Sequence, residues 1–193
     1  GWTRELKQTE GDYLMAVNTN LGGGKTDLII DQQIDIRSNV DNDGSIINTV
    51  TITKEHRGIK NTLFEGVNNV DYFRLYVPKG SELLEATGFE IPSDELFEQS
   101  ELPLKEDEDY TLISTNYSIH EPSETDIWEE SGKTVFGNWI QTAPGETEII
   151  TFTYRLPIQL SSVDQESSLL DIAKSRLGFK DLESHTIFIQ KQP

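Results

Sequence analysis

The stretch that decides the fold is residues 133–157, Lys-Thr-Val-Phe-Gly-Asn-Trp-Ile-Gln-Thr-Ala-Pro-Gly-Glu-Thr-Glu-Ile-Ile-Thr-Phe-Thr-Tyr-Arg-Leu-Pro. Its second half alternates apolar and polar side chains, with Ile150, Phe152, Tyr154 and Leu156 set against Thr151, Thr153 and Arg155. A period of two is typical of an antiparallel strand with one buried face. With Pro144-Gly145 as its turn, the stretch predicts a β-hairpin.

The same alternation recurs along most of the chain. Leu28, Ile30, Ile34 and Ile36 predict a long strand that turns at residues 41–44 and returns through Ile46, Val50 and Ile52. Further strands are expected at these ranges: 13–18, 72–77, 81–89, 110–119, 126–129 and 185–190. Between them, residues 58–69 form a polar loop in which Leu63 and Phe64 are embedded.

Two segments depart from the strand pattern. Ser93 is a suitable N-cap for a short acidic helix running to about Glu101. Apolar residues at helical spacing, with Gly178 as the stop, predict a second helix over 164–178. The expected fold is therefore all-β, an antiparallel immunoglobulin-like β-sandwich with two short helical insertions. It spans residues 1–193 as one domain, and two small β domains divided near residues 60–70 are the alternative.

Composition limits the function classes. The chain has 193 residues and a net charge of −18, which repels phosphate backbones and anionic lipid, so nucleic acid is not expected as a partner. It has no cysteine, and therefore neither a disulfide framework nor a thiolate metal site. It begins Gly-Trp-Thr and is interpreted as a piece of a longer protein, with any anchor outside it.

Four ordered segments together resemble the C-terminal part of a bacterial envelope family, the family of domain of unknown function 4012. They are 12–18 with the Gly-Gly-Gly-Lys loop; 66–84, Gly-Val-Asn-Asn-Val-Asp-Tyr-Phe-Arg-Leu-Tyr-Val-Pro-Lys-Gly-Ser-Glu-Leu-Leu; 132–137 with 144–147 and 154–157; and 189–193. The resemblance implies an exported, membrane-anchored protein whose β-rich part lies outside the cytoplasmic membrane. It implies no reaction, no cofactor and no catalytic residue.

Two short motifs suggest ligands. Gly-Gly-Gly-Lys-Thr at 22–26 resembles part of a phosphate-binding loop, but Thr19 stands where the first glycine is needed and a strand pattern follows, so a flexible connection is favoured. Asn39, Asp41 and Asp43 are spaced like the first half of a calcium loop, whereas Val50 stands at the position of the bidentate acid. A hairpin turn is favoured there, with calcium binding as the alternative.

Catalytic patterns are weak. His56, His120 and His185 lack metal-ligand spacing, and the acidic residues are too numerous to nominate a pair for glycoside hydrolysis. The aromatic residues best suited to stack on sugar are Tyr72, Tyr76, Tyr117, Trp128 and Trp139. Tyr72 and Tyr76 are expected to be exposed if Phe73, Leu75 and Val77 face the core.

The expected function is a non-catalytic extracytoplasmic module of a bacterial surface or envelope protein, a spacer or an interaction and adhesion module. Its partners would be cell-wall glycan or another surface protein, and it would meet the membrane only through an anchor elsewhere. The alternative is a carbohydrate-binding or cell-wall-processing domain. A concave pocket holding two carboxylates, one with a raised pKa, would favour that alternative.

Overall fold

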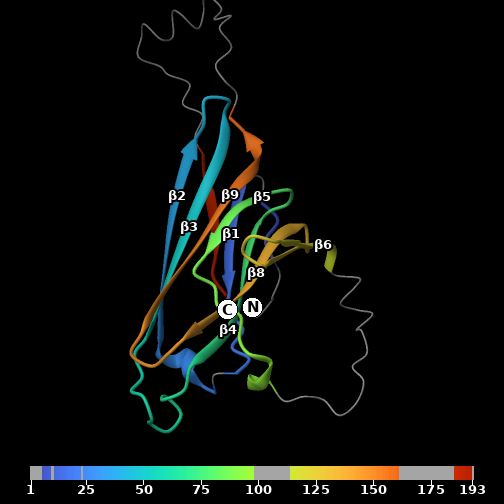
Figure 1. Ribbon diagram of the computed structural model, residues 1–193. Helices are drawn as coiled ribbons and strands as arrows, with labels where there is room; N and C mark the ends of the chain where they lie inside the picture. Colours follow the sequence, from blue (N-terminus) through green and yellow to red (C-terminus); the bar gives the residue numbers. More distant parts are fainter. Residues whose placement is uncertain (1–5, 10, 23, 98–113, 161–184, 193) are drawn as a thin grey trace, which may run out of the picture.

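The computed structural model describes residues 6–9, 11–22, 24–97, 114–160 and 185–192. Almost all the regular structure of these residues is extended, and the strands form two sheets (Figure 1). The larger of the two clusters of buried apolar residues is built from both sheets. The all-β prediction and the two-layer arrangement are confirmed.

The larger sheet has six strands in the order β10-β1-β4-β8-β7-β6, and the smaller has four in the order β2-β3-β9-β5. The six are β1 (Asp12–Val17), β4 (Asn69–Pro78), β6 (Ser114–His120), β7 (Thr125–Glu130), β8 (Lys133–Thr142) and β10 (Ile187–Gln190). The four are β2 (Ile30–Val40), β3 (Ser45–His56), β5 (Glu82–Thr87) and β9 (Thr147–Gln159). Strands from before and after residues 60–70 share both sheets.

The long hairpin predicted from the isoleucine pattern is confirmed as β2 and β3, paired in unbroken register from Ile30 opposite His56 to Val40 opposite Ile46. Leu28 was wrongly included in its first strand. Residues Thr26–Ile29 form a 3-10 turn, η1, and the strand begins at Ile30.

The hairpin predicted at 133–157 is wrong, although both of its arms are strands. β8 pairs with β4 and β7 in one sheet, whereas β9 pairs with β3 and β5 in the other. The Pro144-Gly145 turn therefore carries the chain across the sandwich. Gly145 takes a φ of +81°, and its N–H donates to His56 O at 2.8 Å, which ties the turn to the end of β3.

The core lies between the sheets and is filled by the side chains that the alternation assigned to it. In β9 the buried face consists of Ile150, Phe152, Tyr154 and Leu156. Phe152 lies near Phe73 and Phe136 of the facing sheet, at centroid distances of 6.1 and 6.2 Å. Because rings from both layers meet at this centre, the two sheets depend on each other for burial.

Two further expectations need correction. The helix expected from Ser93 is a single 3-10 turn, η2 (Asp94–Leu96), because Phe97 already has extended backbone and packs on Trp139. The helix expected over 164–178, and residues 98–101 of the first, lie outside the described residues. The sandwich is also not wholly antiparallel, since β10 pairs with β1 in parallel.

Candidate functional site

Two loops lie at the lower end of the molecule in Figure 1: the loop after β1, residues 18–22 and 24–29, and the β3–β4 loop, residues 57–68. Six large apolar side chains on these loops are exposed, and we call this surface the apolar end: Leu21, Leu28, Ile59, Leu63, Phe64 and Val67. Leu28 is 85% exposed, Leu63 80% and Phe64 70%. Covering such side chains with a partner removes apolar surface from water and lowers the free energy.

The two loops are held together by buried polar groups beneath the apolar end. His56 is fully buried, its Nε2 lies 3.0 Å from Val67 O, and its Nδ1 accepts from Gly58 N–H at 3.1 Å. Since Nδ1 accepts, the ring is the tautomer that carries its proton on Nε2 and donates it to the Val67 carbonyl. The imidazole thus bridges the beginning and the end of the β3–β4 loop.

The β3–β4 loop is tied in turn to the loop after β1. Asn69 Nδ2 donates to Thr26 Oγ1 at 3.0 Å and to Asp27 Oδ1 at 2.9 Å, and Arg57 N–H donates to Ile29 O at 3.0 Å. Thr26 is fully buried. These bonds connect residues about 30 to 40 positions apart in sequence and fix one loop against the other.

A buried ion pair lies deeper in the same end. Lys54 Nζ lies 2.5 Å from Asp71 Oδ2, and the two side chains are 3% and 0% exposed. Lys54 also donates to Asn18 Oδ1 at 3.2 Å, and Thr19 N–H donates to the second Asp71 oxygen. Burial raises the pKa of the Asp71 carboxyl, while the Lys54 ammonium acts in the opposite direction. This pair joins β3 in one sheet to β4 in the other.

The exposed tip of the β3–β4 loop has its own internal bonds. Thr62 N–H donates to Ile59 O at 3.1 Å, and Gly66 N–H donates to Thr62 O at 3.0 Å. Phe64 takes a φ of +71°, a conformation that costs a bulky residue of order 1–3 kcal/mol. The Phe64 side chain is therefore exposed to water although its backbone conformation is strained. Strain of this kind is commonly found where a surface serves a function.

Gly58 is required by the close approach of these segments. A Cβ at this position would collide with Glu65 O and with the His56 ring. Because glycine has no Cβ, the end of the loop can pack directly against its beginning. The six large apolar side chains of the apolar end can bind an apolar surface, and exposed charged side chains such as Lys60 and Glu65 lie on the same loop.

Sequence reasoning did not identify the apolar end, although its signal was present. Leu63 and Phe64 stand in a loop of glycine, asparagine and charged residues, where a large apolar side chain has no core to enter. Leu28 was assigned to a strand face instead. The two loops are brought together by strand pairing and by hydrogen bonds between residues distant in sequence, which the local pattern does not reveal.

The predicted calcium half-site forms the β2–β3 turn. Asp43 Oδ1 accepts from Ser45 N–H at 2.9 Å, which lowers the pKa of that carboxyl, and Gly44 has a φ of +83°. The predicted hairpin turn between β2 and β3 is confirmed by this geometry. In the part of the chain that the structure describes, no group of three or more His, Asp or Glu side chains is placed to hold a metal ion.

The Gly-Gly-Gly-Lys-Thr motif leads into η1 rather than into a strand or a long helix. Thr26 Oγ1, the group that a phosphate or its cation would use, is buried and accepts from Asn20 and Asn69. The three histidines lie in separate places. His56 braces the apolar end, His120 Nδ1 lies 2.7 Å from Ser123 Oγ, and His185 Nε2 lies 3.1 Å from Asp12 Oδ2.

The predicted aromatic platform forms a second, covered layer on the outer face of the six-stranded sheet. Phe73, Leu75 and Val77 do face the core, but the exposure expected for Tyr76 is wrong: it is 4% exposed, and Trp128 is 3% exposed. The Tyr76 hydroxyl and the Trp128 Nε1–H both donate to Glu130 Oε2, at 3.2 and 3.1 Å. Leu6 packs against this layer, and its neighbours Lys7 and Gln8 bond to Gln190 and Ser131. This crossing segment was not anticipated from the sequence.

The remaining three aromatics of the predicted platform lie toward its margin. Tyr72 is half-buried and donates to Asp126 at 2.6 Å, as does Tyr117, which is 60% exposed. Trp139 is half-buried between Tyr72 and Phe97, with centroid distances of 5.0 and 5.4 Å. A continuous row of open rings for sugar stacking is thus not formed by these five residues.

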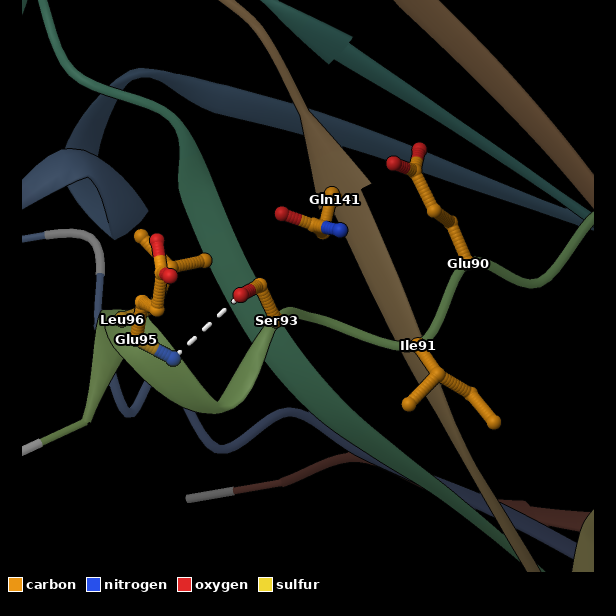
Figure 2. A pocket seen from close by; sticks show the side chains of 6 residues that line it. All are labelled: Glu90, Ile91, Ser93, Glu95, Leu96 and Gln141. Carbon is orange, nitrogen blue, oxygen red and sulfur yellow. Dashed lines mark hydrogen bonds between the residues drawn. The ribbon is translucent and has the colours of Figure 1, made fainter. Parts of the chain in front are cut away.

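A shallow depression, open to solvent, lies beside the end of β8 (Figure 2). It is lined by Glu90, Ile91, Ser93, Glu95, Leu96 and Gln141. Figure 2 shows the two glutamates on opposite sides of Gln141. Nearby Glu148 has a raised pKa because of burial and then of repulsion by Glu146 and Glu90. The depression has a volume of about 590 Å³ and is broadly open to solvent, and we assign no reaction to it.

A scan against protein-family models, a search of curated proteins and a search of solved structures each gave no match. The similarity to the envelope family therefore stays a prediction. Among the described residues, no helix is both long enough and apolar enough to cross a lipid bilayer.

Proposed function

We propose that this chain is a non-catalytic interaction module that binds another protein through its apolar end. The observation that carries the proposal is the display of Leu28, Ile59, Leu63 and Phe64, each at least 70% exposed, on loops braced by buried hydrogen bonds and an ion pair. A surface that is rigid before binding loses little conformational entropy on binding.

The size of the effect fits an interaction surface. Full burial of a large apolar side chain contributes about 1.5–3 kcal/mol. The four most exposed are 70–85% exposed rather than fully exposed, so covering them offers about 5–9 kcal/mol of gross transfer free energy. Loss of translational and rotational freedom consumes several kcal/mol of it. The apolar end alone therefore supports weak, reversible binding, and contacts around it would have to supply higher affinity.

Under the same proposal the chain belongs to the extracytoplasmic part of a bacterial surface or envelope protein, anchored through a segment elsewhere. The sequence resemblance supports this setting, and the negative charge suits an exposed, soluble surface. The immunoglobulin-like type of sandwich is part of the proposal too, supported by two facing sheets of mostly antiparallel strands. A protein partner is favoured over cell-wall glycan because five of the six exposed apolar side chains are aliphatic, whereas sugar faces stack on open rings.

The test compares Leu63→Ser/Phe64→Ser with Val40→Ser/Ile149→Ser, which removes two apolar side chains exposed elsewhere. Immobilised protein is presented with solubilised envelope proteins and, separately, with purified peptidoglycan. We expect the wild type and the control to retain an envelope protein that the loop variant releases at least tenfold faster. Equal retention by all three proteins, or retention of peptidoglycan alone, would refute the proposal.

A further inference from the structure

Within the part of the chain that the structure describes, the four-stranded sheet ends in a long open edge. β2 is its first strand, pairs with β3 alone among the described strands, and forms the outer border of the layer (Figure 1). It has 11 residues, no proline and no break in register with β3. Proteins usually shorten, bend or interrupt such edges to prevent pairing with another chain.

The hydrogen bonds between β2 and β3 determine which backbone groups of β2 are left without a partner in the sheet. At the two ends of the hairpin, Ile29 O accepts from Arg57 N–H and Asp41 N–H donates to Ser45 O. Because bonded and non-bonded pairs alternate in an antiparallel ladder, the odd-numbered residues of β2 bond to β3. The even-numbered residues, among them Gln32, Ile34 and Ile36, therefore direct their N–H and C=O groups to the open edge.

We propose that two copies of this chain pair through β2, antiparallel, about a two-fold axis at Ile34. In this register Ile34 lies opposite Ile34 of the second copy and exchanges two backbone hydrogen bonds with it. Asp31 lies opposite Arg37 of the second copy, and Gln33 lies opposite Asp35. The two four-stranded sheets become one continuous sheet across the dimer.

Charge selects this register. All three charged side chains of β2 are exposed, on the face of the strand that points away from the core. In the proposed register both arginines meet an aspartate. If one strand slides by two residues in one direction, Asp31 lies opposite Asp35 of the second copy. If it slides by two residues in the other direction, Asp35 lies opposite Asp35 of the second copy. Like charges on directly opposed residues repel each other, so both alternative registers are less stable.

Arg37 supports the pairing for a second reason. Within the described residues Arg37 has no acidic partner, whereas Asp31 has Arg57, at 2.7 Å. The guanidinium is thus available to a carboxylate from another molecule. On the inner face, Ile34 and Ile36 are only partly buried within one copy, and each would be covered further by the second copy.

Disulfide trapping tests the register, because the natural chain has no cysteine. Asp31→Cys and Arg37→Cys proteins are mixed and oxidised. Their Cα atoms would lie about 4.5 Å apart across the pair, within disulfide range. Two copies of Asp31→Cys alone would place their cysteines about 20 Å apart. We expect a cross-linked dimer in the mixture and none in either protein by itself; equal cross-linking in all three samples would overturn the register.

Sedimentation equilibrium at submillimolar concentration tests the association itself. Gln32→Pro removes an N–H that points to the open edge and leaves the bonds to β3 intact, so the monomer should fold and the dimer should be lost. Arg37→Glu should raise the dimer Kd about tenfold or more, and the control Arg37→Gln less. A monomeric wild type, or a dimer that Gln32→Pro and Arg37→Glu leave unchanged, would overturn the proposal.

Discussion

Replacing Lys54 by methionine would leave the Asp71 carboxylate buried without the ammonium that faces it. The Asp71 side chain is 0% exposed, so water cannot take the place of the lost cation. The hydrogen bond from Thr19 N–H would remain. In the variant the pKa of Asp71 should rise further, because the lowering effect of Lys54 is lost.

Removal of one partner of a buried ion pair costs about 3–5 kcal/mol. With a urea m-value of about 2 kcal/mol/M, the unfolding midpoint at neutral pH should fall by roughly 1.5–2.5 M. Tryptophan fluorescence in urea measures it. The loss should shrink as the pH is lowered toward the ordinary carboxyl pKa, because a raised pKa penalises the folded state only where the carboxylate is charged in the unfolded chain.

Two further variants isolate the cause. Adding Asp71→Asn to Lys54→Met removes the uncompensated charge and keeps an acceptor for Thr19 N–H, so at least half of the lost stability should return. Lys79→Met breaks an exposed pair with Glu129 and should cost less than about 1 kcal/mol. The reasoning fails if Lys54→Met costs under about 1 kcal/mol, or if adding Asp71→Asn destabilises the protein further.

Three other outcomes are expected. The buried phenols of Tyr13 and Tyr76 have a pKa of about 12, so absorbance near 295 nm should show them ionising late, and stability should fall as the pH rises from the ordinary value of 10 through 12. Phe152→Ala should cost about 3–5 kcal/mol in urea unfolding, against under about 0.5 for the exposed Ile149→Ala. Gly137→Ala should cost about 1–3 kcal/mol by calorimetry, because the new methyl group meets the side chains packed over β8.

Local alternation predicted the strands well, because burial on one face is a property of the strand itself. The inward faces of β3 and β9 were assigned from the sequence, and Ile52 and Phe152 are both fully buried. The hairpin of β2 and β3 was also identifiable, since the turn at residues 41–44 joins two strands that have no other element between them.

Partner choice between strands was not predictable from the same pattern. A strand shows the same alternation of apolar and polar residues whether the turn beside it closes a hairpin or leads to the other sheet. The Pro144-Gly145 turn leads from β8 in one sheet to β9 in the other. The parallel pairing of β10 with β1 joins residues at opposite ends of the chain, such as Tyr13 and Phe188. No local signal specifies such a contact.

The covered aromatic layer and the apolar end escaped prediction for a related reason. Tyr76 was expected to be exposed because it lies on the face away from the core, and a segment near residue 6 covers that face. Conversely, Lys54 was not recognised as buried, because a lysine on an inward face is stable there only when a carboxylate such as Asp71 meets it.

The central claim is that the apolar end is ordered before any partner binds, and amide hydrogen exchange of the free protein tests it most directly. If the loops are braced as described, the amides of Arg57, Thr62 and Gly66 should exchange slowly, since each donates to a carbonyl. The amides of Leu63 and Phe64, for which the structure gives no such bond, should exchange faster. Uniformly rapid exchange across residues 57–68 would contradict a preformed binding surface.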